Sequence, residues 1–198
     1  MALLGVESSA SDHADDVVDG GAPAVFLDRD GVICRSIVLS GKPYAARSLK
    51  EFKLLPYAAQ SVRALSEAGF LVIVITNQPD IGNGLVSQAT VDAIHERLSE
   101  RVAVDQIIVC PHGQKDRCSC RKPATGMLTR AAEMHSINFE RSYLVGDRAS
   151  DIEAGARVGC TTIFIERNYS ESGPDAVDAS VGSLAEAARL ILSGGLDP

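Results

Sequence analysis

Five short apolar segments constrain the fold of this chain more than any other feature of its sequence. Each is apolar along most of its length, which is typical of strands buried on both faces of a parallel sheet. Segments with a helical spacing of apolar residues alternate with them. The strand-like segments span 24–28, 70–76, 106–110, 142–147 and 161–165, and the helix-like segments span 56–69, 87–102, 126–135, 150–159 and 183–192. This alternation predicts an α/β fold, a Rossmann-like three-layer sandwich with a mostly parallel sheet.

The chain length limits the number of domains that the sequence can form. With 198 residues, one hydrophobic core is well within the usual range and two would be cramped. Residues 1–22 are small, polar and acidic, so we expect them to form a flexible tail. We predict one domain over residues 23–193 with no separate cap domain, because about 175 ordered residues leave no room for one.

Charge and hydropathy argue against two classes of partner. The net charge is -7, so the chain lacks the broad positive field that attracts a phosphate backbone. No run of about eighteen apolar residues is present, and the N-terminus lacks the basic and apolar regions of an export signal. We therefore expect no nucleic-acid partner and no membrane partner, and a monomer located in the cytoplasm.

Polar residues follow the strand-like segments at the points where a parallel sheet binds its ligands. An isolated Asp-x-Asp-Gly is often only a turn. Here four such clusters fall at or just after strand ends, and together they favour a functional site over a turn. The clusters are Asp28 with Asp30, then Thr76-Asn77-Gln78, then Lys122, and finally Asp147 with Asp151.

The residue types in these clusters predict phosphoryl transfer with a divalent cation. Neighbouring carboxylates repel one another unless a cation shares their site, and Mg²⁺ prefers oxygen ligands and bridges carboxylates to phosphate. We expect Asp28 to attack phosphorus as the nucleophile and Asp30 to be the general acid and base. Lys122 and the Thr76 hydroxyl would then stabilise the phosphoryl oxygens.

The same residues resemble the four motifs of the haloacid dehalogenase (HAD) superfamily, spread over residues 24–165. Asp-x-Asp follows the first strand-like segment, a threonine ends the second, a basic residue stands in RKP, and GDxxxD follows the fourth. The Cys-x-His and Cys-x-Cys pairs before RKP resemble one branch, which contains D-glycero-D-manno-heptose 1,7-bisphosphate phosphatases and the phosphatase domain of histidinol-phosphate phosphatases. RKPATGM resembles the RKPxPGM of the heptose enzymes, with Thr125 in place of the proline, whereas PDIGNG stands where they have SGIARG, so Asn83 replaces an arginine.

This resemblance implies roles for further residues. Asp28, the Asp30 carbonyl and Asp147 would bind Mg²⁺. Asp151 would support these ligands without binding the metal itself. The substrate would contact Asn77, Gln78, Arg121 and the aromatic Tyr44. The implied activity is a phosphatase of carbohydrate metabolism that acts on a small phosphorylated metabolite, heptose 1,7-bisphosphate first, with histidinol phosphate or another sugar monophosphate as the alternative.

A second group of residues, between 110 and 120, has the composition of a zinc site. Cys110 with His112, and Cys118 with Cys120, form two pairs that face each other across a five-residue loop. Three thiolates and an imidazole complete a tetrahedral shell and leave no open position for catalysis. We therefore predict a structural zinc that fixes the backbone from which Arg121 and Lys122 extend. Reactive thiols and buried cysteines without metal remain alternatives.

The remaining cysteines and histidines receive simpler predictions. Cys34 and Cys160 are expected to be small core residues. His13, His95 and His135 are expected to be surface or helix residues without a special role.

Two functions from other classes remain open. A receiver-like signalling module also uses a parallel sheet, an aspartate at a strand end, Mg²⁺, a threonine and a lysine. The second acid, Asp30, and the zinc loop argue against it, because a receiver needs neither. A zinc-stabilised nucleic-acid module conflicts with the negative net charge.

Overall fold

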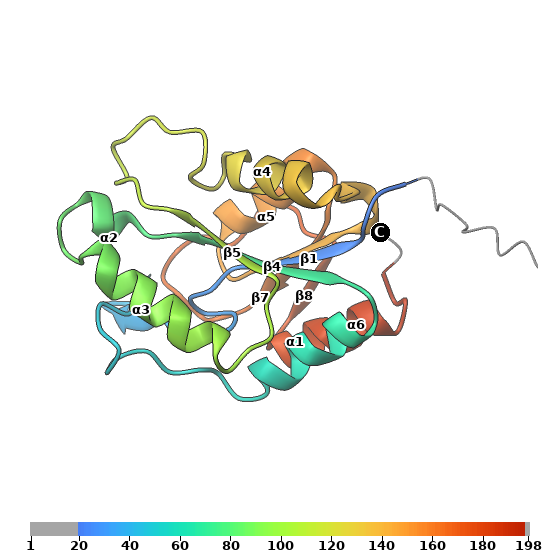
Figure 1. The fold of residues 1–198 in the computed structure, drawn as a ribbon, viewed down its shortest axis with the longest axis horizontal. Coiled ribbons are helices and arrows are strands. Elements are labelled where there is room, and N and C mark those ends of the chain that lie inside the picture. The colour runs from blue at the N-terminus through green and yellow to red at the C-terminus, as the bar shows by residue number, and fades with distance from the viewer. Residues whose placement is uncertain (1–19, 197–198) are drawn as a thin grey trace, which may run out of the picture.

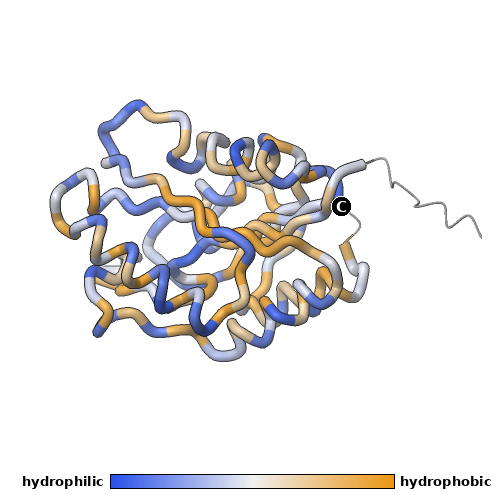
Figure 2. Tube along the Cα trace, in the orientation of Figure 1, coloured by the Kyte–Doolittle hydropathy of each residue, from blue (hydrophilic) through white to orange (hydrophobic). Residues whose placement is uncertain are grey.

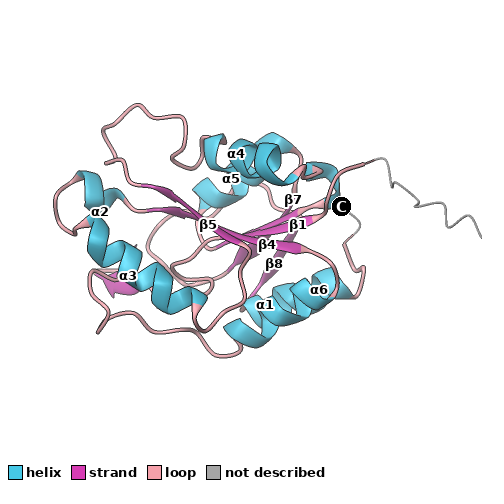
Figure 3. Cartoon of the chain, in the orientation of Figure 1, coloured by secondary structure: helices cyan, strands magenta, loops and turns pink. Residues whose placement is uncertain are grey.

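A six-stranded parallel sheet forms the centre of the molecule (Figures 1 and 3). The computed structural model describes residues 20–196. The strand order is β5-β4-β1-β6-β7-β8. The strands are β1 (Ala24–Leu27), β4 (Leu71–Asn77), β5 (Gln106–Cys110), β6 (Tyr143–Gly146), β7 (Thr161–Ile165) and β8 (Ala179–Val181). All five strands expected from the sequence are present, and the fold class is confirmed.

Helices cover both faces of this sheet and complete the three layers. On one face lie α1 (Ala58–Glu67), α3 (Gln88–Ser99) and α6 (Leu184–Leu192), and on the other lie α4 (Gly126–His135) and α5 (Ala149–Val158). A hydrophobic core lies on each face of the sheet, and alternate residues of β1 point into one or the other. Val25 and Leu27 pack in the core beneath α1, α3 and α6, and Ala24 and Phe26 pack in the core beneath α4 and α5. Figure 2 shows the strands as the apolar centre of the molecule. Burial on both faces explains why these strands are continuously apolar in sequence.

The sequence did not predict the edge strand β8 or three further short features. The segment after β1 contains an antiparallel hairpin of β2 (Ile37–Leu39) and β3 (Lys42–Tyr44). The Pro-Asp-Ile-Gly segment after β4 forms the single-turn helix α2 (Pro79–Gly82). A 3-10 turn, η1 (Phe139–Arg141), precedes β6. Elements of three or four residues bury too little apolar surface to leave a periodic signal in the sequence.

The described residues form one layered α/β unit with loops at the edge of the sheet, and no second folded unit among them covers that edge. Between residues 20 and 196, the insertion after β1 contributes only the β2-β3 hairpin there. No helix in this range is long and apolar enough to cross a membrane. The predicted tail over residues 1–22 lies outside the described residues except for its last three. Of these, Ala22 forms an isolated β-bridge to Ile137.

Candidate active site

A cavity of about 370 Å³ opens at the edge where the parallel strands end. Loops from β1, β4, β5 and β6 meet there, as expected from the parallel direction of the strands. The wall is rich in charge of both signs. Its lining residues are Asp28, Asp30, Ser36, Lys42, Pro43, Tyr44, Ala45, Thr76, Asn77, Pro79, Asp80, Gln114, Arg121, Lys122, Arg148, Ser150, Asp151 and Glu171.

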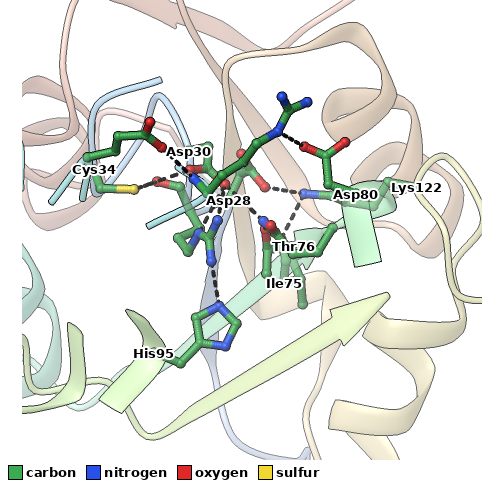
Figure 4. Close-up of polar contacts among 12 residues, drawn as sticks. Asp28, Asp30, Cys34, Ile75, Thr76, Asp80, His95 and Lys122 are labelled. Carbon is green, nitrogen blue, oxygen red and sulfur yellow. Dashed lines mark hydrogen bonds and ion pairs between the residues drawn. The ribbon is translucent and has the colours of Figure 1, made fainter. Parts of the chain in front are cut away.

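A buried lysine joins two carboxylates at the base of this cavity. Lys122 Nζ lies 2.6 Å from Asp28 Oδ1 and 2.7 Å from Asp151 Oδ1, and it donates a hydrogen bond to the Ile75 carbonyl at 2.7 Å (Figure 4). Burial alone would lower the pKa of Lys122, but the carboxylates of Asp151 and Asp28 outweigh it and raise the pKa above its usual value. Lys122 therefore stays charged and supplies a fixed cation beside Asp28.

The Asp28 carboxylate has a raised pKa. Burial is the main cause, Lys122 opposes it, and the carboxylates of Asp151 and Asp30 add to it, so the pKa rises to about 6. Asp147 has the same trend, since burial and then the charges of Asp28 and Asp151 raise its pKa well above the ordinary value. Carboxylates in this state gain most from a cation that shares their site.

Within the described residues, one oxygen atom of Asp147 is available to bind such a cation. Its Oδ2 accepts a hydrogen bond from the Tyr169 hydroxyl at 2.7 Å. Its buried Oδ1 has no hydrogen-bond partner within residues 20–196. Ligand atoms of Asp28, Asp147 and Asp151 lie within 4.8 Å of one another. Three buried carboxylates beside one lysine fit a divalent cation that prefers oxygen ligands.

Asp151 differs from Asp147 because both of its oxygens are occupied. Oδ1 pairs with Lys122. Oδ2 accepts a hydrogen bond from the Arg148 backbone N–H at 3.1 Å, at the start of α5. Asp151 therefore orients Lys122 and the first turn of α5, and the open oxygen for a cation belongs to Asp147.

Gly31 allows the loop after β1 to approach Asp147. Its φ of +89° lies in the left-handed region, and a Cβ built there would fall 1.7 Å from Asp147 Oδ2. Only glycine fits between the two strand-end loops. The Asp-Gly pair that reads as a turn in sequence thus also makes room for the carboxylate of Asp147.

Asp30 lies among several hydrogen-bond donors. Its Oδ2 accepts from Arg29 Nε at 3.0 Å and from Gln78 Nε2 at 2.9 Å, and Arg29 Nη2 lies 2.8 Å away. The Cys34 thiol lies 3.4 Å from Oδ1. Arg29 itself is fully buried, and its Nη1 lies 2.7 Å from His95 Nε2 (Figure 4).

The residues at the end of β4 support the site in different ways. Thr76 is buried and accepts a hydrogen bond from Gln78 Nε2 at 2.8 Å. Asn77 lines the cavity, but its side chain donates to the Lys122 carbonyl at 3.1 Å and accepts from the Lys122 N–H at 3.0 Å. Gln78 lies behind the cavity wall and connects Thr76 to Asp30. Asn77 and Gln78, expected to touch substrate, thus hold Lys122, Thr76 and Asp30 in place.

Arg121 and Tyr44 both line the cavity, as expected for residues that touch substrate. Arg121 Nη1 is buried, and the part of the chain that the structure describes offers it no hydrogen-bond partner. A buried guanidinium nitrogen without a partner is costly unless a ligand satisfies it. Lys42 and Arg148 add two further cations to the same wall.

The four residues of the expected zinc site come together. Cys110 Sγ lies 3.7 Å from Cys118 Sγ, 3.1 Å from Cys120 Sγ and 3.6 Å from His112 Nδ1, and His112 Nδ1 lies 3.2 Å from Cys120 Sγ. A tetrahedron with zinc–sulfur bonds of about 2.3 Å has sulfur–sulfur edges of about 3.8 Å, so the cluster needs only slight expansion to hold zinc. A complete set of four donors could bind Zn²⁺.

The zinc cluster is tied to the loop that follows β4. The Gln78 N–H donates to the Cys110 carbonyl at 2.8 Å, and the Gly82 N–H donates to the Pro111 carbonyl at 2.9 Å. The Asn83 side chain donates to Gln114 Oε1 at 2.8 Å. Asn83 therefore contacts the zinc loop at the mouth of the cavity.

The predictions for the other cysteines and histidines have mixed outcomes. Cys34 and Cys160 are buried, as expected. His135 lies at the end of α4, and His13 is outside the described residues. His95 is on the helix α3, as expected, but it is buried at 9% exposure and its ring contacts Arg29, so it is not a plain helix residue. Its helical spacing with Ile94 and Leu98 could have indicated burial.

Comparisons with known proteins agree with this geometry. A family model described as HAD-hydrolase-like matches residues 119–187. The D-glycero-beta-D-manno-heptose-1,7-bisphosphate 7-phosphatase of Pseudomonas aeruginosa is 37% identical over 147 residues, which are 72% of this chain and 80% of that protein. The D-glycero-alpha-D-manno-heptose-1,7-bisphosphate 7-phosphatase of Mycobacterium bovis is 35% identical over 178 residues, 84% of this chain and 90% of that protein. The chain belongs to the HAD-like phosphatases.

A solved structure shows the same similarity over most of the fold. The D,D-heptose 1,7-bisphosphate phosphatase of B. bronchiseptica, complexed with magnesium and phosphate, has a TM-score of 0.76 and 30% sequence identity, over 87% of this chain and 99% of that chain. The resemblance to the HAD superfamily is therefore confirmed, and the chain is an enzyme, a phosphoric monoester hydrolase.

Sequence reasoning about this phosphatase missed residues that approach the site from the loop after β7. Tyr169 donates to Asp147, and Arg167 Nε donates to the Gly31 carbonyl at 2.7 Å. Glu171 pairs with Arg148 at 2.7 Å. The loop 166–173 is polar and has no motif. Its position after the fifth strand, at the ligand-binding edge, was the one available signal.

Replacing His95 with glutamine should make the stability of this phosphatase less sensitive to acid. Burial and then the Arg29 charge lower the pKa of His95 from 6.5 to about 4, against the opposing carboxylates of Asp30 and Asp92. The stability that depends on neutral His95 is fully present above pH 6.5 and is lost as the pH falls toward 4. Between pH 7 and pH 5, urea denaturation should show the wild type losing about 2 kcal/mol more unfolding free energy than His95→Gln.

Both proteins share every other acid-sensitive group, including the zinc ligands, so their difference isolates His95. An identical pH dependence of the unfolding free energy in the two proteins would contradict this prediction.

Proposed function

We propose that this chain is a Mg²⁺-dependent phosphatase that hydrolyses D-glycero-D-manno-heptose 1,7-bisphosphate through an aspartyl-phosphate intermediate. The observation that carries the reaction is the convergence of Asp28, Asp30, Thr76 and Lys122 on one cavity. These residues come from separate segments of the chain. They supply a nucleophile, a proton donor, a hydroxyl and a cation, which are the parts that phosphoryl transfer to a carboxylate requires.

In the first step, a carboxylate oxygen of Asp28 attacks phosphorus. The bond from phosphorus to the substrate oxygen breaks, and Asp30 gives its proton to that oxygen. The products of this step are the dephosphorylated substrate and an aspartyl phosphate at Asp28.

In the second step, Asp30 accepts a proton from water while the water oxygen attacks phosphorus. The bond from phosphorus to Asp28 breaks, and inorganic phosphate leaves. The Asp28 carboxylate and protonated Asp30 are restored, so the cycle is balanced in protons and bonds.

Other residues of the site stabilise the transferred group. Lys122 and the Thr76 hydroxyl offer donors to the phosphoryl oxygens, where charge is concentrated. Asp28, Asp147 and the Asp30 carbonyl would hold Mg²⁺, which when bound stabilises negative charge on the phosphoryl group. The Oδ1 of Asp147, which has no hydrogen-bond partner among residues 20–196, supports its place among these ligands. Asp151 and Asn77 hold Lys122 in position.

The cations of the cavity wall support a substrate with a second anionic group. Arg121, Lys42 and Arg148 line the cavity in addition to Lys122. The buried Nη1 of Arg121 lacks a hydrogen-bond partner among the described side chains and backbone, so a substrate oxygen would satisfy it. A sugar bisphosphate offers one phosphate to Asp28 and a second to these cations. The similar proteins named above are named for both anomers, so the anomer is left to the experiment below.

The Cys3His cluster is proposed to hold one structural Zn²⁺ per chain. The residues between the pairs, 113–117, are Gly, Gln, Lys, Asp and Arg and have almost no apolar side chain with which to pack. Metal binding supplies the folding free energy that such a loop lacks. The cluster directly precedes Arg121 and Lys122, so its order fixes the backbone from which both cations extend.

The proposed setting is that of a metabolic enzyme. From the charge and hydropathy of the sequence we infer a location in the cytoplasm and no nucleic-acid or membrane partner. We also expect a monomer. The receiver-like alternative is disfavoured because Asp30 lines the cavity beside Asp28, where it can protonate a leaving group.

Replacing either catalytic acid should impair turnover, but to different extents and for different reasons. Asp28→Asn removes the nucleophile and should leave no measurable activity on any substrate. Asp30→Asn should lower kcat/KM for phenyl phosphate by about 100- to 10,000-fold, and much less for para-nitrophenyl phosphate, because an acidic phenol leaves without a proton. Asp175→Asn, at an exposed acid that does not line the cavity, is the control. Equal losses on the two substrates would contradict the division of roles.

Removing one zinc ligand should cost stability as well as activity. Metal analysis of the wild type should find one tightly held zinc per chain. Cys118→Ser should lose it, with a fall in melting temperature of about 5 °C or more, which for a chain of this size is roughly 1–2 kcal/mol. Cys160→Ala, a buried cysteine outside the cluster, should retain the zinc. Full activity and an unchanged melting temperature in a zinc-free preparation would overturn the structural role.

A substrate panel tests the proposed specificity. We expect kcat/KM for heptose 1,7-bisphosphate, measured for both anomers, to exceed that for fructose 1,6-bisphosphate, glycerol phosphates and histidinol phosphate by at least about tenfold, which is about 1.4 kcal/mol of transition-state discrimination. Arg121→Ala should reduce this preference, because it should lower kcat/KM for bisphosphates more than kcat/KM for monophosphates. A tenfold preference for histidinol phosphate would assign the enzyme to the alternative substrate and leave the chemistry intact.

A further inference from the structure

We propose that His95, acting through Arg29, is a positioning residue for proton transfer by Asp30. His95 lies on α3, 66 residues from Arg29 and outside all four clusters at the strand ends. The inference rests on the proposed role of Asp30 as general acid and base, and it adds two side chains to the machinery that performs that role.

Arg29 provides the contact with Asp30. Although it stands between Asp28 and Asp30 in the chain, its side chain is fully buried and does not line the cavity. Nε donates to Asp30 Oδ2 at 3.0 Å, and Nη2 lies 2.8 Å from the same oxygen. A buried guanidinium must be paired to be tolerated, and Asp30 is the carboxylate that pairs with it here.

His95 fixes the third nitrogen of the same guanidinium. Its Nε2 lies 2.7 Å from Arg29 Nη1 (Figure 4). Since every guanidinium nitrogen is a donor, Nε2 must be the acceptor, so the imidazole is neutral with its hydrogen on Nδ1. The lowered pKa of His95 agrees with this state. Because the guanidinium is a rigid plane, holding Nη1 sets the direction in which Nε and Nη2 point.

This arrangement makes the two oxygens of Asp30 unequal. Oδ2 receives Arg29 Nε, the ion-pair contact from Nη2, and a hydrogen bond from Gln78 Nε2 at 2.9 Å. An oxygen that accepts two N–H donors and lies beside a guanidinium charge is a poor place for a proton, so the transferable proton belongs on Oδ1. Arg29 and His95 thereby select the oxygen that gives and takes the proton.

Cys34 completes the surroundings of Oδ1 without competing for its proton. Its Sγ lies 3.4 Å from Asp30 Oδ1 and also 3.4 Å from the Arg29 carbonyl. The thiol can donate to the carbonyl when Oδ1 carries the proton and to Oδ1 when the carboxylate is ionised. A thiol is a weak donor, so it can change partner at small cost between the two steps.

The test compares variants of His95 on two aryl phosphates. Leucine removes the acceptor, asparagine is polar but one carbon too short to reach Arg29, and glutamine can place its amide oxygen near the position of Nε2. The readout is kcat/KM for phenyl phosphate and para-nitrophenyl phosphate, which reports steps up to departure of the phenol and excludes hydrolysis of the aspartyl phosphate. The control variants are His135→Leu and His135→Gln. His135 ends α4, and its Nε2 lies 2.9 Å from Gln106 Oε1.

We expect His95→Leu and His95→Asn to lower kcat/KM for phenyl phosphate about tenfold more than for para-nitrophenyl phosphate. His95→Gln should restore phenyl phosphate turnover to within about threefold of the wild type. The His135 variants should change both substrates equally. If His95→Leu does not fold, as judged by its melting temperature, the comparison of His95→Asn with His95→Gln decides the question by itself.

Two outcomes overturn the proposal. One is an equal loss on both substrates in His95→Leu and His95→Asn, and the other is a failure of His95→Gln to recover the difference. Asp30→Asn separates this from a failure of the proposed function. If Asp30→Asn shows the leaving-group dependence and the His95 variants do not, only the positioning role fails, whereas its absence in Asp30→Asn refutes the role of Asp30 itself.

Discussion

The site is organised around an excess of buried negative charge that one lysine only partly balances. Asp28, Asp147 and Asp151 are each less than a tenth exposed, and Lys122 is the cation buried among them. Burial raises the pKa values of Asp28 and Asp147, and the neighbouring carboxylates, which one lysine cannot fully neutralise, add to this rise. The arrangement becomes favourable when a divalent cation and an anionic substrate enter together.

Lys122 is therefore the side chain whose position matters most, and several parts of the fold hold it. The end of β4 contributes the Ile75 carbonyl and the two-way hydrogen bonds of Asn77. The start of α5 contributes Asp151, and further along α5 Arg157 Nη1 donates to the Pro123 carbonyl at 2.9 Å. The Cys3His cluster ends at Cys120, directly before Arg121. Lys122 lies on an irregular loop, but contacts from both β4 and α5 hold it.

The four aspartates differ in what their environments leave them free to do. Asp28 pairs with Lys122 at the base of the cavity, where a nucleophile is needed. Asp30 has one oxygen held by Arg29 and Gln78 and the other near a thiol. Within the described part of the chain, Asp147 Oδ1 has no hydrogen-bond partner, whereas both oxygens of Asp151 have one. Identical side chains acquire separate roles because hydrogen bonding selects the form and direction of each.

The sequence by itself determined the layered α/β fold, because strands buried on both faces must be apolar throughout and helices must carry one apolar face. It also determined which edge holds the site, since parallel strands bring their carboxyl ends together, and it identified the zinc cluster from four ligands at close spacing. The elements it missed, such as the β2-β3 hairpin and α2, bury too little to leave a pattern.

Only the tertiary structure decided which side chains touch. Nothing in sequence relates His95 to Arg29 or Tyr169 to Asp147, because these contacts join segments that lie far apart in the chain. Likewise, Asn77 and Gln78 resemble substrate ligands by position, yet the structure turns their amides toward Lys122, Thr76 and Asp30. A motif fixes the residue type and its place on the sheet edge. The direction of its side chain is set by the donors and acceptors that folding brings around it.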